Sequence, residues 1–295
     1  MTTPSSLPDS THIGRIALRV TDLESMVGFS TGTSLGSRCC GAMEEGATLG
    51  VDNRSLLVLD GADTAARGAT PCQRGSFTWH PGVPSRDALG DALTRVRETW
   101  QLAGASDHGV SAALYLTDPE GNGIEIYRDY PRADWPRDDE DHIQMGTYPL
   151  DLEPVAAAAT GASALPGETD VGHVHLEVSS LSTFNDFYVD TVGFVEEAST
   201  PGARFVAAGG YHHHMWRTSA NRRVEPVSGR GLAWFEVELP ESETLDDLRR
   251  SPRGQCLSGD AEGESRSRSQ GPTRFRCGLL PPDSGAFFVS DRHPS

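Results

Sequence analysis

Alternating polar and apolar residues in 172–178 give the first set of side chains that could do chemistry. The segment reads Gly-His-Val-His-Leu-Glu-Val, and side chains in a strand point alternately to opposite faces of the sheet. His173, His175 and Glu177 then share the face opposite the apolar residues. Because burying an unpaired polar group costs roughly 1–3 kcal/mol, this face is either solvated or lines a ligand cavity.

A carboxylate in the middle of an apolar strand is the second signal. Residues 123–127 read Gly-Ile-Glu-Ile-Tyr, so Glu125 and Tyr127 point away from the two isoleucines. Glu125 is either a metal ligand or a side chain on an exposed edge strand. The residues alone leave both interpretations open.

A histidine triplet inside Tyr-His-His-His-Met-Trp (211–216) is the third signal. The pattern predicts a strand over 211–217, with His212 and His214 on one face and His213 on the other. Two imidazoles at this spacing suit metal binding or proton transfer near neutral pH. A solvated edge is the alternative.

The elements that must position these residues follow one repeated pattern, in which an alternating strand is followed by a cap and an amphipathic helix. The repeated strands end at equivalent apolar residues, and Ser85 and Ser242 stand where helix N-caps should be. The four starts are 14–20, 78–83, 172–178 and 234–239. Between them, residues 118–123 predict a hairpin turn, and further strands are predicted at 47–51, 55–59, 113–117, 123–127 and 204–208.

The charge balance limits the partners. The formal net charge is −17, and all 25 basic residues are Arg. An anionic surface repels nucleic acid and anionic membranes, so we expect neither as a partner. Abundant acidic residues without Lys fit a salt-rich cytoplasm, and a GC-rich genome that replaces Lys by Arg fits as well. With no long apolar run and no signal-like N-terminus, we expect a cytoplasmic protein. The residues leave the oligomeric state open, and a homo-oligomer is one of the alternatives.

Three motifs in this order resemble the catechol 2,3-dioxygenases of the vicinal oxygen chelate superfamily, which also holds glyoxalases and bleomycin resistance proteins. They are Asp-Pro-Glu-Gly-Asn-Gly-Ile-Glu-Ile-Tyr-Arg-Asp (118–129), Gly-His-Val-His-Leu-Glu-Val (172–178) and Gly-Gly-Tyr-His-His-His (209–214). The resemblance implies an α+β fold of four βαβββ modules paired into two half-barrel lobes. We expect the last module to be incomplete, because residues 251–295 are mostly Ser, Gly, Pro and Arg. The implied domains are 11–130 with modules one and two, a linker over 131–170, 171–250 with module three and the start of module four, and an irregular tail over 251–295.

The resemblance also implies a cofactor, Fe(II), held by two His and one Glu. His173 and Glu125 match two of these ligands. The position of the other His is occupied by Thr78, and His80 lies two residues further on the same face as its substitute. His175 is a further candidate metal ligand.

The implied activity is extradiol ring cleavage of a catechol-type aromatic substrate by O2. His212 and His214 are implied as acid/base groups or replacement ligands, and Tyr127 and Tyr211 as hydrogen-bond partners of the substrate's oxygens. Two alternatives have the same fold. One is a glyoxalase-like isomerase that uses another divalent metal such as Mn, Zn or Ni, and the other is a metal-free protein that binds or sequesters a small molecule.

Three stretches depart from the family pattern, namely 29–43, 68–82 and 251–295, and they contain all five cysteines. An odd number of Cys without a secretion signal argues against a disulfide framework. A proline, Pro81, lies inside an expected strand, where it should act as a breaker. We hypothesise that these stretches are translated out of frame and that the chain is degraded or inactive, which its nucleotide sequence can test.

Overall fold

The computed structural model describes residues 6–32, 35–43, 46–61, 77–178, 181–200, 202–219, 231–240 and 273–278. Two compact units are present. The central unit comprises Arg15–Val174 and Gly229–Leu232, and the terminal unit comprises Met1–Gly14, His175–Ser228 and Ala233–Ser295. The boundary between them falls within three strands. The domain limits and the linker predicted from the sequence stay predictions.

The first strands of the central unit form one βαβββ module. Its last strand lies between the first and third strands and is parallel to the first (Ile16↔Leu57) and antiparallel to the third (Leu49↔Leu57), which gives the order β1-β4-β3-β2. Side chains such as Ile16 and Leu18 are buried, as alternation predicts. The elements are β1 (His12–Arg19), α1 (Leu23–Thr31), β2 (Arg38–Met43), β3 (Gly46–Val51) and β4 (Arg54–Asp60).

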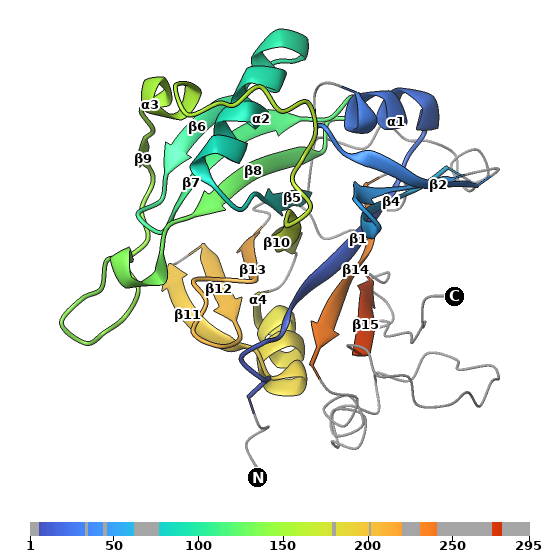
Figure 1. Ribbon diagram of the computed structural model, residues 1–295. Coiled ribbons are helices and arrows are strands. Elements are labelled where there is room, and N and C mark those ends of the chain that lie inside the picture. Colours follow the sequence, from blue (N-terminus) through green and yellow to red (C-terminus); the bar gives the residue numbers. More distant parts are fainter. Residues whose placement is uncertain are drawn as a thin grey trace, which may run out of the picture. The chain divides into compact units, whose positions relative to one another are not determined.

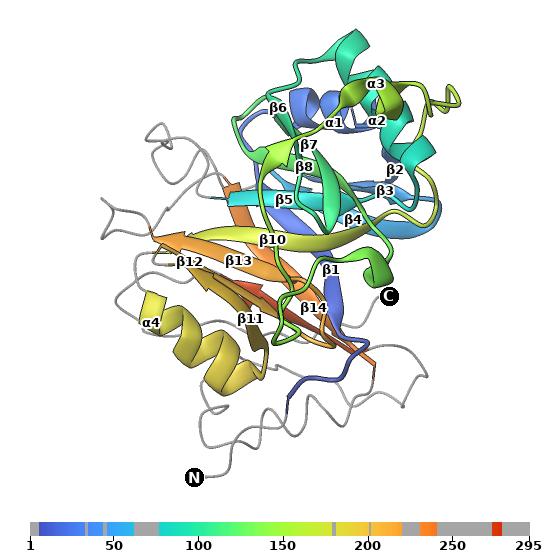
Figure 2. The same cartoon turned by 90° about the vertical axis from the view of Figure 1, so that its left-hand side faces the viewer.

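The second module of the central unit repeats this topology, and one further strand lies on each side of it. Its first strand is parallel to its last, and the order is β10-β5-β8-β7-β6-β9. Helix α2 packs along one face of this sheet (Figures 1 and 2). The elements are β5 (Phe77–Gly82), α2 (Arg86–Thr99), β6 (Gly104–Asp107), β7 (Ser111–Thr117), β8 (Gly123–Asp129), η1 (Arg132–Asp134), β9 (Tyr148–Pro149), α3 (Leu152–Ala156) and β10 (Asp170–Val178).

Local signals in the sequence explain several of these boundaries. Ser85 caps α2 as predicted, because its side chain accepts a hydrogen bond from the Ala88 N–H at 3.1 Å. In the predicted turn, Asp118 Oδ1 accepts from the N–H groups of Glu120 and Asn122, each at 2.9 Å. One expectation is wrong: Pro81 does not break its strand, since β5 runs through it and its pairing with β8 continues at Gly82.

The terminal unit contains the remaining strands. One group has the order β11-β12-β13-β10, and β14 lies between β15 and the first residues of β1. The π-helical segment η2 ends at Gly193, whose φ of 98° is left-handed. The elements are α4 (Leu181–Phe184), η2 (Asn185–Val192), β11 (Val195–Thr200), β12 (Ala203–Ala207), β13 (Met215–Ser219), β14 (Gly231–Leu239) and β15 (Thr273–Gly278).

The predicted strand over the histidine triplet is corrected by the structure. β13 begins only at Met215, and the three histidines lie in the turn that joins it to β12. Gly209 and Gly210 have φ of 61° and 60°, a left-handed conformation that turns the chain before the triplet is reached. The alternation of faces assumed for these histidines therefore does not apply.

The segment after β8 is held against α2 and β4 by hydrogen bonds. Asp91 on α2 accepts from the Thr160 N–H and hydroxyl at 2.7 and 2.8 Å, and from the Gly161 N–H at 2.7 Å. Arg95 donates to the Ala162 carbonyl at 2.8 Å. Arg54 on β4 donates to the carbonyl of Thr169, immediately before β10. These contacts fix the path by which the chain returns to the sheet.

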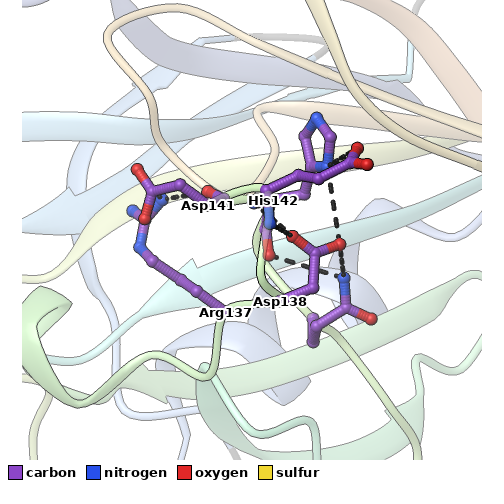
Figure 3. A network of polar contacts seen from close by, with 6 residues as sticks. Arg137, Asp138, Asp141 and His142 are labelled. Atoms are coloured by element: carbon purple, nitrogen blue, oxygen red, sulfur yellow. Dashed lines mark hydrogen bonds and ion pairs between the residues drawn. The ribbon is translucent and has the colours of Figure 1, made fainter.

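An exposed loop in this segment is held by its own polar groups (Figure 3). Asp138 accepts from the His142 N–H at 2.9 Å and from the Gln144 side chain at 3.0 Å. Arg137 donates to the Asp141 carbonyl at 2.7 Å. His142 is exposed.

Two further expectations concern cysteines and membranes. Cys39, Cys40 and Cys277 are free thiols, whereas Cys72, Cys256 and the predicted cap Ser242 lie outside the described residues. None of the helices in the described ranges has the length and apolar character that crossing a membrane would require.

Replacing Asp91 by Asn should make the stability of the chain less dependent on pH. Burial raises the pKa of Asp91, but hydrogen bonds from Thr160 and Gly161 together lower it below its ordinary value. The charged form therefore stabilises the fold above the unfolded pKa of about 3.9, and this contribution is lost as the pH falls through the lower folded pKa.

We expect Asp91→Asn to lower the free energy of unfolding by about 1.5–3 kcal/mol at pH 7. Urea unfolding should show this difference shrinking toward pH 3, because protonated Asp resembles Asn. Asp139→Asn, in the exposed loop, is the control and should change little. An Asp91→Asn deficit that is equal at both pH values would contradict the charged hydrogen-bond role.

Candidate metal centre

Three neighbouring strands of the central unit bring together polar side chains that are far apart in the sequence. β5 lies between β10 and β8 and is parallel to β8, with Trp79↔Ile124 and Gly82↔Tyr127 as paired residues. This register places His80 beside Glu125. His173 comes from β10, the strand on the other side of β5.

The three side chains form a compact buried cluster. His80 Nδ1 lies 3.0 Å from Glu125 Oε2, and the rings of His80 and His173 have centroids 4.1 Å apart at 62°. One ligand atom from each residue lies within 4.8 Å of the others. The exposed fractions of His80, Glu125 and His173 are 0%, 5% and 1%. A cluster so enclosed is not a solvated face or an exposed edge.

The electrostatics of the cluster keep the carboxylate charged. Burial raises the pKa of Glu125, but His80, His108 and a hydrogen bond from Tyr115 together hold it below its ordinary value. His80 Nε2 is buried and has no hydrogen-bond partner in the described part of the chain. A buried nitrogen of this kind costs free energy unless something else pairs with it.

Tyr127 lies against the cluster and packs on His173. Their ring centroids are 4.4 Å apart, with 31° between the planes. The Tyr127 hydroxyl lies close to the backbone of two glycines. A Cβ on Gly82 would come within 2.9 Å of it, and a Cβ on Gly172 would overlap it. The sequence predicted that Tyr127 contacts the substrate, and that role stays a prediction.

His108 and Tyr115 complete the surroundings of Glu125. His108 Nε2 lies 2.5 Å from the Tyr115 hydroxyl and 3.8 Å from Glu125 Oε1. The pKa of Tyr115 is raised by burial and by Glu125, which accepts its hydrogen bond. Neither residue is among the predicted site residues, and Tyr115 lies in the strand predicted at 113–117. The pairing Tyr115↔Glu125 in β7 and β8 was the signal that could have found it.

The other predicted site residues belong to the terminal unit. His175 stacks on Trp216, with ring centroids 3.7 Å apart. His212 is buried, with Nδ1 2.8 Å from His213 Nδ1, and the ring centroid of Tyr211 lies 4.1 Å from that of His212.

His214 in the same turn has a contact with a structural effect. Its Nδ1 accepts a hydrogen bond from the Ala208 N–H at 3.2 Å, which closes the turn before β13. The catalytic or metal-binding roles of His175, Tyr211, His212 and His214 stay predictions.

Solved structures of known proteins share this fold. A presumed dioxygenase from Bacillus subtilis strain 168 matches with a TM-score of 0.56 at 12% identity, over 99% of this chain and 87% of that one. Glyoxalase I from Zea mays matches with a TM-score of 0.51 at 15% identity, over 95% and 92% of the two chains. These likenesses confirm the predicted α+β fold.

Sequence comparison identifies the family. No protein-family model matches the chain. The catechol-2,3-dioxygenase of Bacillus subtilis (strain 168) is 37% identical over 251 residues, which span 82% of this chain and 87% of that protein. Identity at this level over most of both chains exceeds what a shared fold alone explains. The chain therefore belongs to the vicinal oxygen chelate superfamily, in the family of this catechol-2,3-dioxygenase.

Proposed function

We propose that the chain is an extradiol-type dioxygenase that opens catechol-type aromatic rings with O2 and Fe(II). Membership of the family supports dioxygenase-like function. The observation that carries the proposal is the buried cluster of His80, Glu125 and His173, whose ligand atoms lie within 4.8 Å of one another. Two imidazoles and one carboxylate are the donor set of non-haem Fe(II) oxygenases.

The residues present fit a divalent metal. Ligands must be deprotonated, and the lowered pKa of Glu125 keeps its carboxylate ionised. A metal would also pair with the buried His80 Nε2. Bound Fe(II) would supply a Lewis acid with open positions for vicinal oxygens and O2. The same donor set suits Mn, Zn or Ni, and it favours a metal enzyme over a metal-free binding protein.

The chain's own residues would hold the metal and transfer protons. His80, Glu125 and His173 are fixed on three paired strands, so their donor atoms are positioned before anything binds. The imidazoles of His212 and His214 are our candidates for accepting a catechol proton, and Tyr127 and Tyr211 for hydrogen-bonding the substrate. In His212→Asn, a changed pH profile of kcat with unchanged metal content would support proton transfer.

The full chain, purified anaerobically and loaded with Fe(II), should bind about one metal ion and convert catechol to a yellow ring-opened product. Iron analysis and absorbance of the product measure these two outcomes. Zinc or nickel in place of iron, without ring opening, would favour the isomerase. Absence of both metal and turnover, with retained binding of an aromatic ligand, would contradict the enzyme proposal.

Glu125→Gln should abolish tight metal binding. The change keeps the size of the side chain but removes the charge that faces His80 at 3.0 Å. We expect more than about 100-fold weaker affinity, beyond the 10–100-fold that loss of an outer partner of a ligand costs. Calorimetric titration of the metal-free chain with Mn(II) measures it. Glu98→Gln, on the exposed face of α2, should bind like the parent chain.

His80→Asn and His175→Asn test which histidine completes the metal site. The structure puts His80 against Glu125 and stacks His175 on Trp216. We therefore expect His80→Asn to lose the metal and His175→Asn to retain it, as measured by metal content after dialysis. His142→Asn, in the exposed loop, controls for loss of any imidazole. Retention of the metal by His80→Asn and its loss from His175→Asn would reverse the assignment.

A further inference from the structure

The two oxygens of Glu125 face different partners. Oε2 lies 3.0 Å from His80 Nδ1, in the direction of the cluster. Oε1 lies 3.8 Å from His108 Nε2, and the Tyr115 hydroxyl forms a hydrogen bond to the same carboxylate. A carboxylate that is held on one side has a fixed orientation on the other.

Tyr115 is placed for this contact by the sheet itself. In the antiparallel pairing of β7 and β8, Tyr115 lies directly opposite Glu125. Directly opposite residues project to the same face, with Cβ atoms about 4.5–5.5 Å apart. The tyrosine hydroxyl can therefore reach the carboxylate without leaving the strand pair.

His108 holds the tyrosine hydroxyl in turn. Its Nδ1 lies 2.6 Å from the Gly146 carbonyl, and a carbonyl only accepts, so Nδ1 donates this bond. Nε2 lies 2.5 Å from the Tyr115 hydroxyl. Because the single hydroxyl proton goes to Glu125, Nε2 donates to the hydroxyl oxygen. The Gly146 N–H also donates to the His108 carbonyl at 3.1 Å, so the histidine is clamped through its ring and its backbone.

The clamp is anchored in the loop drawn in Figure 3. Asp138 binds His142 and Gln144 within the loop, and the Gln144 N–H donates to the Pro136 carbonyl at 2.8 Å. Gly146 follows two residues later. A surface loop with its own internal bonds thus presents the carbonyl that orients His108.

We infer that Tyr115 and His108 are positioning residues for the metal-binding carboxylate. They hold the carboxylate on one side so that Oε2 stays directed at His80. The inference rests on the proposed metal function, because orientation of Glu125 matters only if this group binds a metal. Outer partners of metal ligands orient them in many proteins, and their loss weakens metal binding about 10–100-fold.

Tyr115→Phe tests the inference, because it removes the hydroxyl and keeps the ring. Titration of the metal-free full chain with Mn(II) should show 10–100-fold weaker binding. The electron paramagnetic resonance spectrum of bound Mn(II) should also change. Tyr130→Phe is the matched control, since Tyr130 donates to Asp107 at 2.8 Å, beside His108 but not to Glu125. It should bind Mn(II) like the parent chain.

His108→Asn keeps the inference testable if Tyr115→Phe folds poorly, because the His108 side chain is 21% exposed. This variant should also bind Mn(II) more weakly. Combined with Tyr115→Phe it should add little, since His108 acts through the tyrosine.

Parent-like Mn(II) affinity in both single variants would overturn the positioning role and leave the proposed function standing. Failure of the parent chain to bind Mn(II), Fe(II) or any other divalent metal would instead overturn both.

Discussion

The buried charge of Glu125 is the constraint on which the site depends. An ionised carboxylate inside a sheet is strongly unfavourable unless other groups pair with it. β8 is an inner strand, so partners can come from both of its neighbours. β5 supplies His80 through a parallel register, and β7 supplies Tyr115 through an antiparallel one. Shifting either register by one residue would turn a partner to the other face of the sheet. Glu125 can therefore stay charged only if these strands pair in the observed registers.

The site also depends on the return of the chain to this sheet after β8. His173 can join the cluster only if β10 lies beside β5, more than forty residues after β8 ends. Asp91 on α2 and Arg54 on β4 bind the intervening segment at Thr160 and Thr169. α3 packs where Gly90 leaves room, since a Cβ there would come within 2.5 Å of the Val155 carbonyl. The predicted linker segment thus directs the strand that carries the second histidine.

Local patterns predicted the elements well, because alternation and capping act over a few residues. β3, β4, β7, β8 and the Ser85 cap all follow from such patterns. Local patterns cannot bring Glu125 to His173, since that meeting depends on strand order, which no local period encodes, and only the family resemblance implies them as ligands of one metal. His80 was doubtful because Thr78 holds the family position and Pro81 follows, yet β5 continues through the proline. Alternation alone predicts a strand over the histidine triplet, whereas the preceding Gly209-Gly210 pair makes a turn there.

The motifs singled out separately in the sequence form one packing unit. His80 and Glu125 are neighbours in β5 and β8, and two residues further on the same face Gly82 pairs with Tyr127. Gly172 precedes His173 on the next strand and leaves room for the same tyrosine hydroxyl. Neither glycine is among the residues with positive φ. The absence of a side chain at these two positions is therefore explained by the space that Tyr127 needs, and not by the freedom of the backbone. A Cβ at Gly172 would overlap the Tyr127 hydroxyl, and a Cβ at Gly82 would lie 2.9 Å from it and 2.6 Å from Asp170 Oδ1. Gly172 of the Gly-His motif therefore leaves the space that the hydroxyl of Tyr127 occupies. Tyr127, from the Ile-Glu-Ile-Tyr motif, in turn packs on the His173 ring that faces His80.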